Sequence, residues 1–205
     1  MIFPNSGLYA ITQTEGKQPE QVIQEVASAL KGGAGVIQYR DKNPVDKVFL
    51  AKQLLQLCHQ YNVPLLINDD TELACQVGAD GVHLGRDDGD ITAAREKLGD
   101  KAIIGVSCYD DINIAIKAET KGVDYVAFGR FFPSTSKPLA LPAHTETLNL
   151  AKQKIKVPIV AIGGILPENA DILLTAGADL LAVIGGVFDS EPESSAKAYT
   201  HLFKE

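Results

Sequence analysis

A short pattern recurs four times along this chain and constrains its fold more than any other feature. Each copy begins with a glycine after a helical stretch, continues through small or acidic residues and ends in a β-prone run. The copies start at Gly33, Gly78, Gly122 and Gly177, which lie 45, 44 and 55 residues apart. Glycine commonly follows the last turn of a helix. This spacing accommodates two strand–helix units per copy, so the pattern predicts four quarter-units and eight strands.

Four further β-prone runs lie between the copies, at residues 8–12, 65–68, 103–107 and 159–162. The runs are largely apolar rather than alternating, which is typical of parallel strands covered by helices. Apolar residues at helical spacing fill the gaps, for example Val22, Val26 and Leu30. A last helix is expected over about residues 192–203.

The unbroken alternation of strand and helix predicts an α/β fold, a single-domain (β/α)8 TIM barrel over residues 1–205. A doubly wound open sheet is the competing fold, but the Gly-rich fingerprint that it usually carries near its first strand is missing. The longest stretch without a helical or strand pattern is residues 130–142, with three prolines. A loop of this length inside a compact domain is usually functional.

Charge and composition exclude several classes of protein. The net charge of −7 argues against broad nucleic-acid binding. No run of about 18 apolar residues predicts a membrane span, and the N-terminus lacks the charged and apolar regions of a signal peptide. Cys58, Cys75 and Cys108 fit no zinc spacing, so we interpret them as reduced cysteines of a cytoplasmic protein.

The expected strand ends divide the mouth of the barrel into two unlike sides, and reactive groups in this fold sit at these ends. One side carries polar and charged side chains, namely Gln38, Arg40, Lys42, Asn68, Asp69, Asp88, Ser107 and Lys137. On the other side two strands end at glycine pairs, Gly163-Gly164 and Gly185-Gly186. Backbone N–H groups at such loops attract phosphate. Tight turning alone is the alternative interpretation of each pair.

Asp69 and Asp88 are candidate ligands of Mg²⁺, which takes one or two carboxylates and keeps its other positions for water and phosphate oxygens. Ordinary loop acids are the alternative. For Asp70 we favour a cap on the helix that begins near Thr71. His83 lies inside a strand, where a histidine is more often a satisfied core or rim group than a catalyst. The residue types alone therefore indicate a diphosphate on Mg²⁺ and a monophosphate on the glycine pairs.

Seven segments, in order, resemble the thiamine-phosphate synthase family, in register from about residue 7 to residue 188. They are Leu8-Tyr9-Ala10-Ile11-Thr12, Gln38-Tyr39-Arg40-Asp41-Lys42, Ile67-Asn68-Asp69-Asp70, Gly81-Val82-His83-Leu84-Gly85, Ile104-Gly105-Val106-Ser107, Phe132-Pro133-Ser134 with Lys137-Pro138, and Ala161-Ile162-Gly163-Gly164-Ile165. The resemblance implies a transferase of thiamine biosynthesis. Its reaction joins 4-amino-5-hydroxymethyl-2-methylpyrimidine diphosphate to hydroxyethylthiazole phosphate and yields thiamine monophosphate and pyrophosphate.

The same resemblance implies the roles of the site residues. The pyrimidine diphosphate would be held by Gln38, Tyr39, Arg40, Asp41, Lys42, Asn68, Ser107 and Lys137, and catalysis would rest on Arg40, Lys42, Ser107 and Lys137. Mg²⁺ would bind Asp69 and Asp88, and the thiazole phosphate would lie against Ser134, Thr135, Ser136, Gly164, Ile184 and Gly185. A dissociative substitution would leave a pyrimidine methyl cation for the thiazole nitrogen to capture. Closure of residues 130–142 would exclude water from it.

The chain departs from the family pattern in a few places. Arg130 stands where many members have proline, and Ser134 and Ser136 stand where threonine is frequent. Gly185-Gly186 replaces the usual Ser-Ala, so we expect altered phosphate binding there without loss of function. A thiazole tautomerase-like barrel and a non-catalytic phosphate-binding regulator are the alternative functions. The expected partners are small molecules, and a homo-oligomer is compatible with the sequence.

Overall fold

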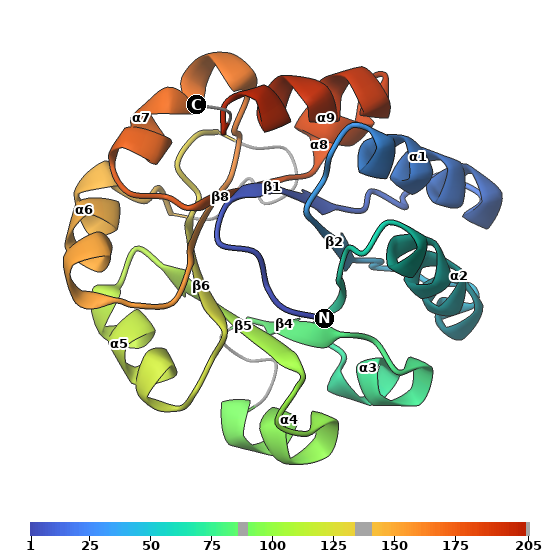
Figure 1. The fold of residues 1–205 in the computed structure, drawn as a ribbon, viewed down its shortest axis with the longest axis horizontal. Helices are drawn as coiled ribbons and strands as arrows, with labels where there is room; N and C mark the ends of the chain where they lie inside the picture. The colour runs from blue at the N-terminus through green and yellow to red at the C-terminus, as the bar shows by residue number, and fades with distance from the viewer. Residues whose placement is uncertain (86–89, 134–140, 204–205) are drawn as a thin grey trace.

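The fold is a closed barrel of eight parallel strands with helices around its outside (Figure 1). The computed structural model describes residues 1–85, 90–133 and 141–203. The strands follow one another around the barrel in chain order, and β1 pairs with β8 to close it. This arrangement confirms the predicted (β/α)8 barrel and excludes the open sheet. Across these ranges no helix is both long and apolar enough to cross a membrane.

The predicted elements are present, with small shifts at their ends. The strands are β1 Gly7–Ile11, β2 Val36–Tyr39, β3 Leu65–Asn68, β4 Gly81–Leu84, β5 Ile103–Tyr109, β6 Tyr125–Gly129, β7 Ile159–Ile162 and β8 Leu180–Val183. The helices are α1 Pro19–Lys31, α2 Lys47–Gln60, α3 Thr71–Val77, α4 Ile91–Leu98, α5 Ile112–Thr120, α6 Thr145–Lys154, the 3₁₀ helix η1 Pro167–Asn169, α7 Asp171–Thr175, α8 Gly185–Phe188 and α9 Pro192–His201. The last helix therefore ends two residues earlier than expected.

The recurring glycine pattern marks four junctions between a helix and the next strand. Three copies carry an aspartate two residues after the glycine, at Asp80, Asp124 and Asp179. Each carboxylate accepts a hydrogen bond from a backbone N–H at the start of the neighbouring earlier strand, at 2.9, 2.8 and 3.0 Å, from Leu65, Ile104 and Ile159 respectively. A side chain from an outer helix pairs with each aspartate, namely His59, Arg95 and Lys152. The repeat therefore ties the starts of successive strands together.

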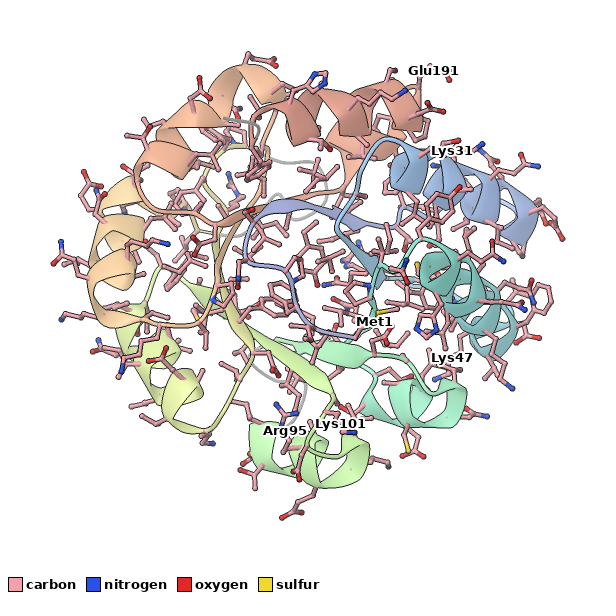
Figure 2. The ribbon with its side chains drawn as sticks, viewed as in Figure 1. Met1, Lys31, Lys47, Arg95, Lys101 and Glu191 are labelled. Carbon is pink, nitrogen blue, oxygen red and sulfur yellow. The ribbon has the colours of Figure 1, made fainter. Side chains whose placement is uncertain are left out.

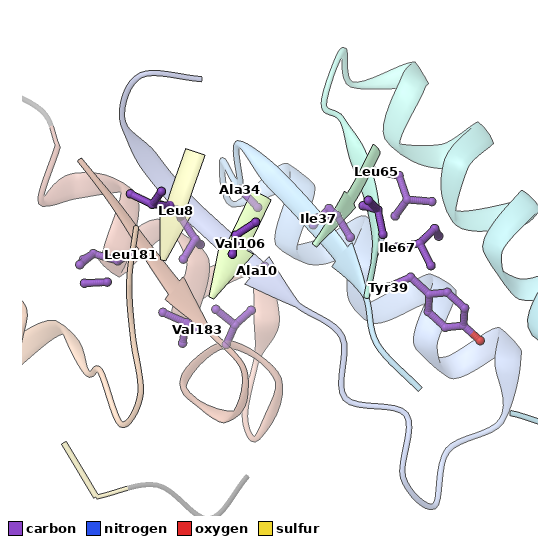
Figure 3. Close-up of a cluster of buried hydrophobic side chains, with 14 of the residues drawn as sticks. Leu8, Ala10, Ala34, Ile37, Tyr39, Leu65, Ile67, Val106, Leu181 and Val183 are labelled. Atoms are coloured by element: carbon purple, nitrogen blue, oxygen red, sulfur yellow. The ribbon is translucent and has the colours of Figure 1, made fainter. Parts of the chain in front are cut away.

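Buried side chains form two separate cores. The larger core lies between the strands and the helices, and part of it is drawn in Figure 3. The smaller core fills the inside of the barrel, because successive strand residues point to opposite faces. The N-terminal segment closes this inner core. Phe3 stacks on Tyr125 with ring centroids 4.1 Å apart, and Met1 lies within the ring of helices in Figure 2.

The base of the stretch at residues 130–142 is held by hydrogen bonds. The N–H of Ala143 donates to the Arg130 carbonyl at 2.7 Å. Asp110 accepts bonds from the backbone N–H of His144 at 3.0 Å and from the Thr147 hydroxyl at 2.6 Å. Nδ1 of His144 lies 2.6 Å from the same carboxylate. Asp110 therefore anchors the segment that follows this stretch at the start of α6.

We expect Asp124→Ala to destabilise the barrel, because the Ile104 N–H loses its side-chain acceptor and the Arg95 guanidinium loses its carboxylate partner. Removing a charged hydrogen-bond partner should cost about 2 kcal/mol of unfolding free energy. Asp124→Asn, which keeps an acceptor, should cost less. Urea unfolding measures both, and Asp100→Ala, on the exposed turn before β5, is the control. Equal stability of Asp124→Ala and the control would contradict the role of the repeat.

The pair of His144 and Asp110 predicts a pH dependence. The hydrogen bond to Asp110 and its charge raise the pKa of His144. This contribution to stability is therefore present below the usual histidine pKa of about 6.5 and is lost as the pH rises through the raised value. Asp110→Asn should lower the His144 pKa toward its usual value. An NMR titration of the imidazole C–H signals tests this, and an unchanged midpoint would contradict it.

Candidate active site

A cavity of about 330 Å³ opens at the C-terminal ends of the strands. Each of the eight strands contributes to its lining through Tyr9, Gln38, Asn68, His83, Ser107, Ala127, Val160 and Ala182, in order from β1 to β8. The polar members of this set come from the first five strands, and the apolar members come from the last three. The cavity wall is therefore chemically divided, as the strand ends predicted.

The structure brings most of the described candidate residues into this one cavity. Its lining includes Gln38, Arg40, Asn68, Asp69, Ser107, Gly164, Ile184 and Gly185. These residues come from loops and strand ends on both sides of the mouth, and they range along the chain from Gln38 to Gly185. Asp88, Ser134, Thr135, Ser136 and Lys137 lie outside the described residues, so their placement stays a prediction.

Three candidates of the segment at residues 38–42 are not among the residues that line the cavity. Tyr39 points outward into the core between strands and helices, where Figure 3 shows it. Burial and the nearby carboxylates of Asp41 and Asp46 raise the pKa of Tyr39. Asp41 accepts a bond from the Asn43 N–H at 3.0 Å, and Lys42 is exposed. Residues 38–42 were expected to bind the substrate together. Because successive strand residues point to opposite faces, Gln38 faces the cavity and Tyr39 faces the helices.

Arg40 is held at the cavity wall by its own backbone. The buried hydroxyl of Thr12 accepts a bond from the Arg40 N–H at 2.9 Å and donates to the Arg40 carbonyl at 3.0 Å. Thr12 follows β1, so this pair of hydrogen bonds continues the pairing of β1 with β2 beyond the ends of the strands. The guanidinium of Arg40 therefore projects from a fixed point on the rim.

The two acidic residues in the turn after β3, Asp69 and Asp70, have different roles. Asn68 donates from its amide to Asp69, and Asp69 adopts a φ of 63°, in the left-handed region. Asp69 lines the cavity. Asp70 instead accepts a bond from the Leu73 N–H at 2.8 Å, which confirms the predicted helix cap. Although partial burial opposes ionisation, the Lys47 ammonium lowers the pKa of Asp70.

The residues at this edge fit a magnesium ion held largely by water and phosphate. The Asp69 carboxylate and the Asn68 amide offer hard oxygen donors at one strand end. The described residues contain no group of three or more His, Cys, Asp or Glu side chains able to enclose a metal. Such an ion would therefore be shared between few protein ligands and its substrate, with Asp88 as the second predicted ligand.

The pair Gly163-Gly164 is required by packing as well as by its place in the cavity. Both residues have positive φ, 107° and 63°. A Cβ atom would lie 2.2 Å from the Arg130 Cβ at Gly163 and 2.2 Å from the Pro133 carbonyl oxygen at Gly164. The tight turn therefore requires both glycines, and it also leaves bare backbone on the cavity wall.

Gly185 and Gly186 begin α8, and the first N–H groups of a helix have no acceptor within it. A Cβ on Gly186 would lie 2.2 Å from the Tyr199 hydroxyl, which donates to the Ile165 carbonyl at 3.0 Å. A Cβ on Gly185 would lie 2.3 Å from the Asp189 carboxylate. Two other side chains therefore take the space in which a Ser-Ala pair would have its side chains.

Among the cavity residues that sequence reasoning missed are Tyr9, Arg130 and Asp189, which it gave no role, and His83, which it treated as a core or rim group. Tyr9 and His83 sit at inward positions of β1 and β4, in runs that were read as largely apolar. Counting alternate residues back from each strand end would have identified them. Arg130 and Asp189 place one cation and one carboxylate near the glycine pairs.

Comparisons with known proteins agree on one family. The family model described as thiamine monophosphate synthase matches residues 8–187. The thiamine-phosphate synthase of Nitrosococcus oceani is 52% identical over 200 residues, which cover 96% of this chain and 92% of that protein. That of Marinobacter nauticus is 48% identical over 202 residues, with coverage of 96% and 90%. A solved thiamine phosphate pyrophosphorylase from Pyrococcus furiosus is 34% identical with a TM-score of 0.86, covering 97% of this chain and 95% of that one.

We expect Gly186→Ala to destabilise the protein by about 2 kcal/mol, because the new methyl group overpacks against the Tyr199 hydroxyl. In a Tyr199→Phe background the same change should cost at least about 1 kcal/mol less, because the hydroxyl is gone. Urea unfolding of the wild type, both single variants and the double variant measures the coupling. Strictly additive free energies would contradict this contact.

Proposed function

Because the chain belongs to the thiamine monophosphate synthase family, we propose that the cavity at the strand ends is the active site of the synthase reaction. The protein is an enzyme of thiamine biosynthesis, a transferase that forms thiamine monophosphate from a pyrimidine diphosphate and a thiazole phosphate. One observation carries the assignment of the site. The described candidates for both substrates line a single cavity, with Arg40 and Asp69 on one side and Gly164 and Gly185 on the other.

The pyrimidine diphosphate is proposed to lie over β2, β3 and β5. Gln38, Asn68 and Ser107 offer amide and hydroxyl groups that suit the ring nitrogens and amino group of a pyrimidine. Arg40 offers a planar guanidinium, which binds phosphate oxygens in pairs. Lys42, which follows β2, and Lys137 are proposed to add positive charge.

Asp69 and Asp88 are proposed to hold Mg²⁺ beside this diphosphate. When bound, the ion supplies positive charge that stabilises the departing pyrophosphate. Arg40, Lys42 and Lys137 neutralise the same developing charge, so breaking the bond between the methylene carbon and the phosphate oxygen becomes easier. The thiazole nitrogen then forms the new bond to that carbon. The cavity walls keep water away from the carbon in the interval.

The thiazole phosphate is proposed to lie against Gly164, Ile184 and Gly185, with Ser134, Thr135 and Ser136 closing over it. The N–H groups at the start of α8 support this placement, because the first N–H groups of a helix have no acceptor within the helix. No protein nucleophile is required. Burial raises the pKa of Cys58 and Cys108 to about 12, and neither thiol lines the cavity.

A thiazole tautomerase-like barrel is the alternative on the same fold. It has no need of a diphosphate site, so Arg40 and Asp69 in the cavity favour the synthase, as do the named relatives. A non-catalytic regulator has no such support. We further propose that residues 1–205 form one domain, that the enzyme is cytoplasmic and that its partners are its small-molecule substrates.

The test is to incubate the purified protein with both substrates and Mg²⁺ and to measure thiamine monophosphate. Arg40→Ala should lower kcat/KM about 100-fold, because a preorganised charge at the leaving group is lost. Arg40→Lys should retain part of the activity, and Lys156→Ala, on the exposed turn before β7, should match the wild type. Absence of product from the folded wild type would overturn the assignment.

A further inference from the structure

A carboxylate lies in the part of the cavity where we place the thiazole phosphate. Asp189 lines the cavity together with Gly164, Ile184 and Gly185, the described residues that are proposed to hold this phosphate. A Cβ atom at Gly185 would lie 2.3 Å from one oxygen of the Asp189 carboxylate and 3.4 Å from the other. A negative charge is therefore next to the backbone that is proposed to bind an anion.

The short helix α8 brings Asp189 to this position. The N–H of Asp189 donates to the Gly185 carbonyl at 2.8 Å, so the two residues lie one helical turn apart. Helical side chains point toward the N-terminus of their helix, which carries the Asp189 carboxylate back over Gly185. Gly185 does not have a positive φ, so its backbone conformation does not require glycine. The missing side chain at Gly185 instead leaves room for the carboxylate.

Protein groups do not neutralise this carboxylate within the described ranges. There the Asp189 carboxylate accepts no hydrogen bond and forms no ion pair, although Arg130 lines the same cavity. Lys17 donates to the Phe188 carbonyl at 3.5 Å, but its ammonium pairs with Glu25 at 2.6 Å. Asp189 is exposed, so water solvates its charge in the free protein. A ligand that binds at Gly185 displaces this water and meets the charge directly.

The position of the Asp189 carboxylate distinguishes two forms of the thiazole by their end groups. A phosphate brings negative charge to the carboxylate, and two like charges in close contact repel each other, which weakens binding. A free hydroxyl can instead donate its proton to the carboxylate, in a charge-assisted hydrogen bond. The carboxylate therefore favours the alcohol, whereas the backbone N–H groups at the start of α8 favour the phosphate.

We propose that Asp189 is a specificity-determining residue, whose carboxylate weakens binding of the thiazole phosphate and lets the unphosphorylated thiazole alcohol compete for the same place. This proposal rests on the proposed function of the cavity. The alcohol would react by the same exchange, in which the methylene carbon loses the pyrophosphate oxygen and gains the thiazole nitrogen, and the product would be unphosphorylated thiamine. The end group takes no part in this exchange, so the discrimination appears in binding.

Asp189→Asn is the test variant, because the amide keeps the shape of the side chain and removes its charge. The measured quantities are KM for the thiazole phosphate and the inhibition constant of the alcohol against it, at saturating pyrimidine diphosphate. The ratio of the inhibition constant to this KM should rise about tenfold in Asp189→Asn, mainly through a lower KM. An unchanged or smaller ratio would overturn the proposal, as would an alcohol that does not compete in the wild type.

Ionic strength gives a second measurement, which separates the charge of Asp189 from its shape. Salt screens an exposed charge, and the screening length falls from about 10 Å at 0.1 M to about 3 Å at 1 M. The difference in KM for the thiazole phosphate between the wild type and Asp189→Asn should therefore shrink over this range. A difference that does not change with salt would overturn the proposal, because it would follow from shape alone.

Glu168→Gln is the matched control. It removes an exposed acid from η1, which follows the Gly163-Gly164 turn, and Glu168 is not among the residues that line the cavity. Its ratio should stay within about twofold of the wild-type value, because solvent and salt screen its charge. The same rise in Glu168→Gln as in Asp189→Asn would overturn the assignment of the effect to Asp189.

Calorimetric binding of the thiazole phosphate keeps this proposal separate from the synthase assignment, because it needs no turnover. The thiazole phosphate should bind more tightly to Asp189→Asn than to the wild type. Tighter binding without any thiamine monophosphate formed would support the role of Asp189 and overturn only the synthase assignment. Product formation with equal binding to both proteins would overturn the role of Asp189 alone.

Discussion

The closed ring of hydrogen bonds between parallel strands is the constraint on which the rest of this protein depends. β1 pairs with both β2 and β8, so the sheet has no edge and each pairing register fixes the next. Asp80, Asp124 and Asp179 secure this register at the strand starts, where each accepts a backbone N–H of another strand. Because the starts are fixed, the strand ends are fixed as well, and their side chains converge on one cavity.

The sequence allowed the barrel to be predicted because its signals are local. A glycine after four of the helices and a β-prone run after each of these glycines mark junctions without knowledge of distant contacts. The facing of individual strand residues was less accessible, because the runs are apolar on both faces, so the outward position of the Tyr39 side chain was not predicted. The hydrogen bond between the Tyr9 and Tyr125 hydroxyls inside the barrel was beyond reach, since these tyrosines are 116 residues apart. Asp88 and Lys137 lie outside the described residues, so their roles stay predictions from residue type, expected position and family resemblance.

The inside of the barrel combines two physical requirements. Near the N-terminal ends of the strands, the inside is packed with apolar and aromatic side chains that include Phe3 and Ile103. Toward the cavity, a chain of hydrogen bonds connects Gln38, Tyr9, Tyr125, His83 and Ser107, and each of these side chains has a partner. A partly satisfied network would be costly in a medium of low dielectric, so the chain is stable only as a whole. The chain also joins groups deep in the barrel to Ser107 at the mouth.

The contact of Gly186 with Tyr199 links the mouth of the barrel to its last helix. The two positions share one volume, since the hydroxyl of α9 occupies the place of a missing side chain on α8. As long as position 199 is a tyrosine, a side chain at position 186 would collide with its hydroxyl. Alanine at position 186 is therefore easier to accommodate once the hydroxyl at position 199 is gone. The terminal helix thereby restricts the order of sequence changes open to the loop that we propose to hold the thiazole phosphate.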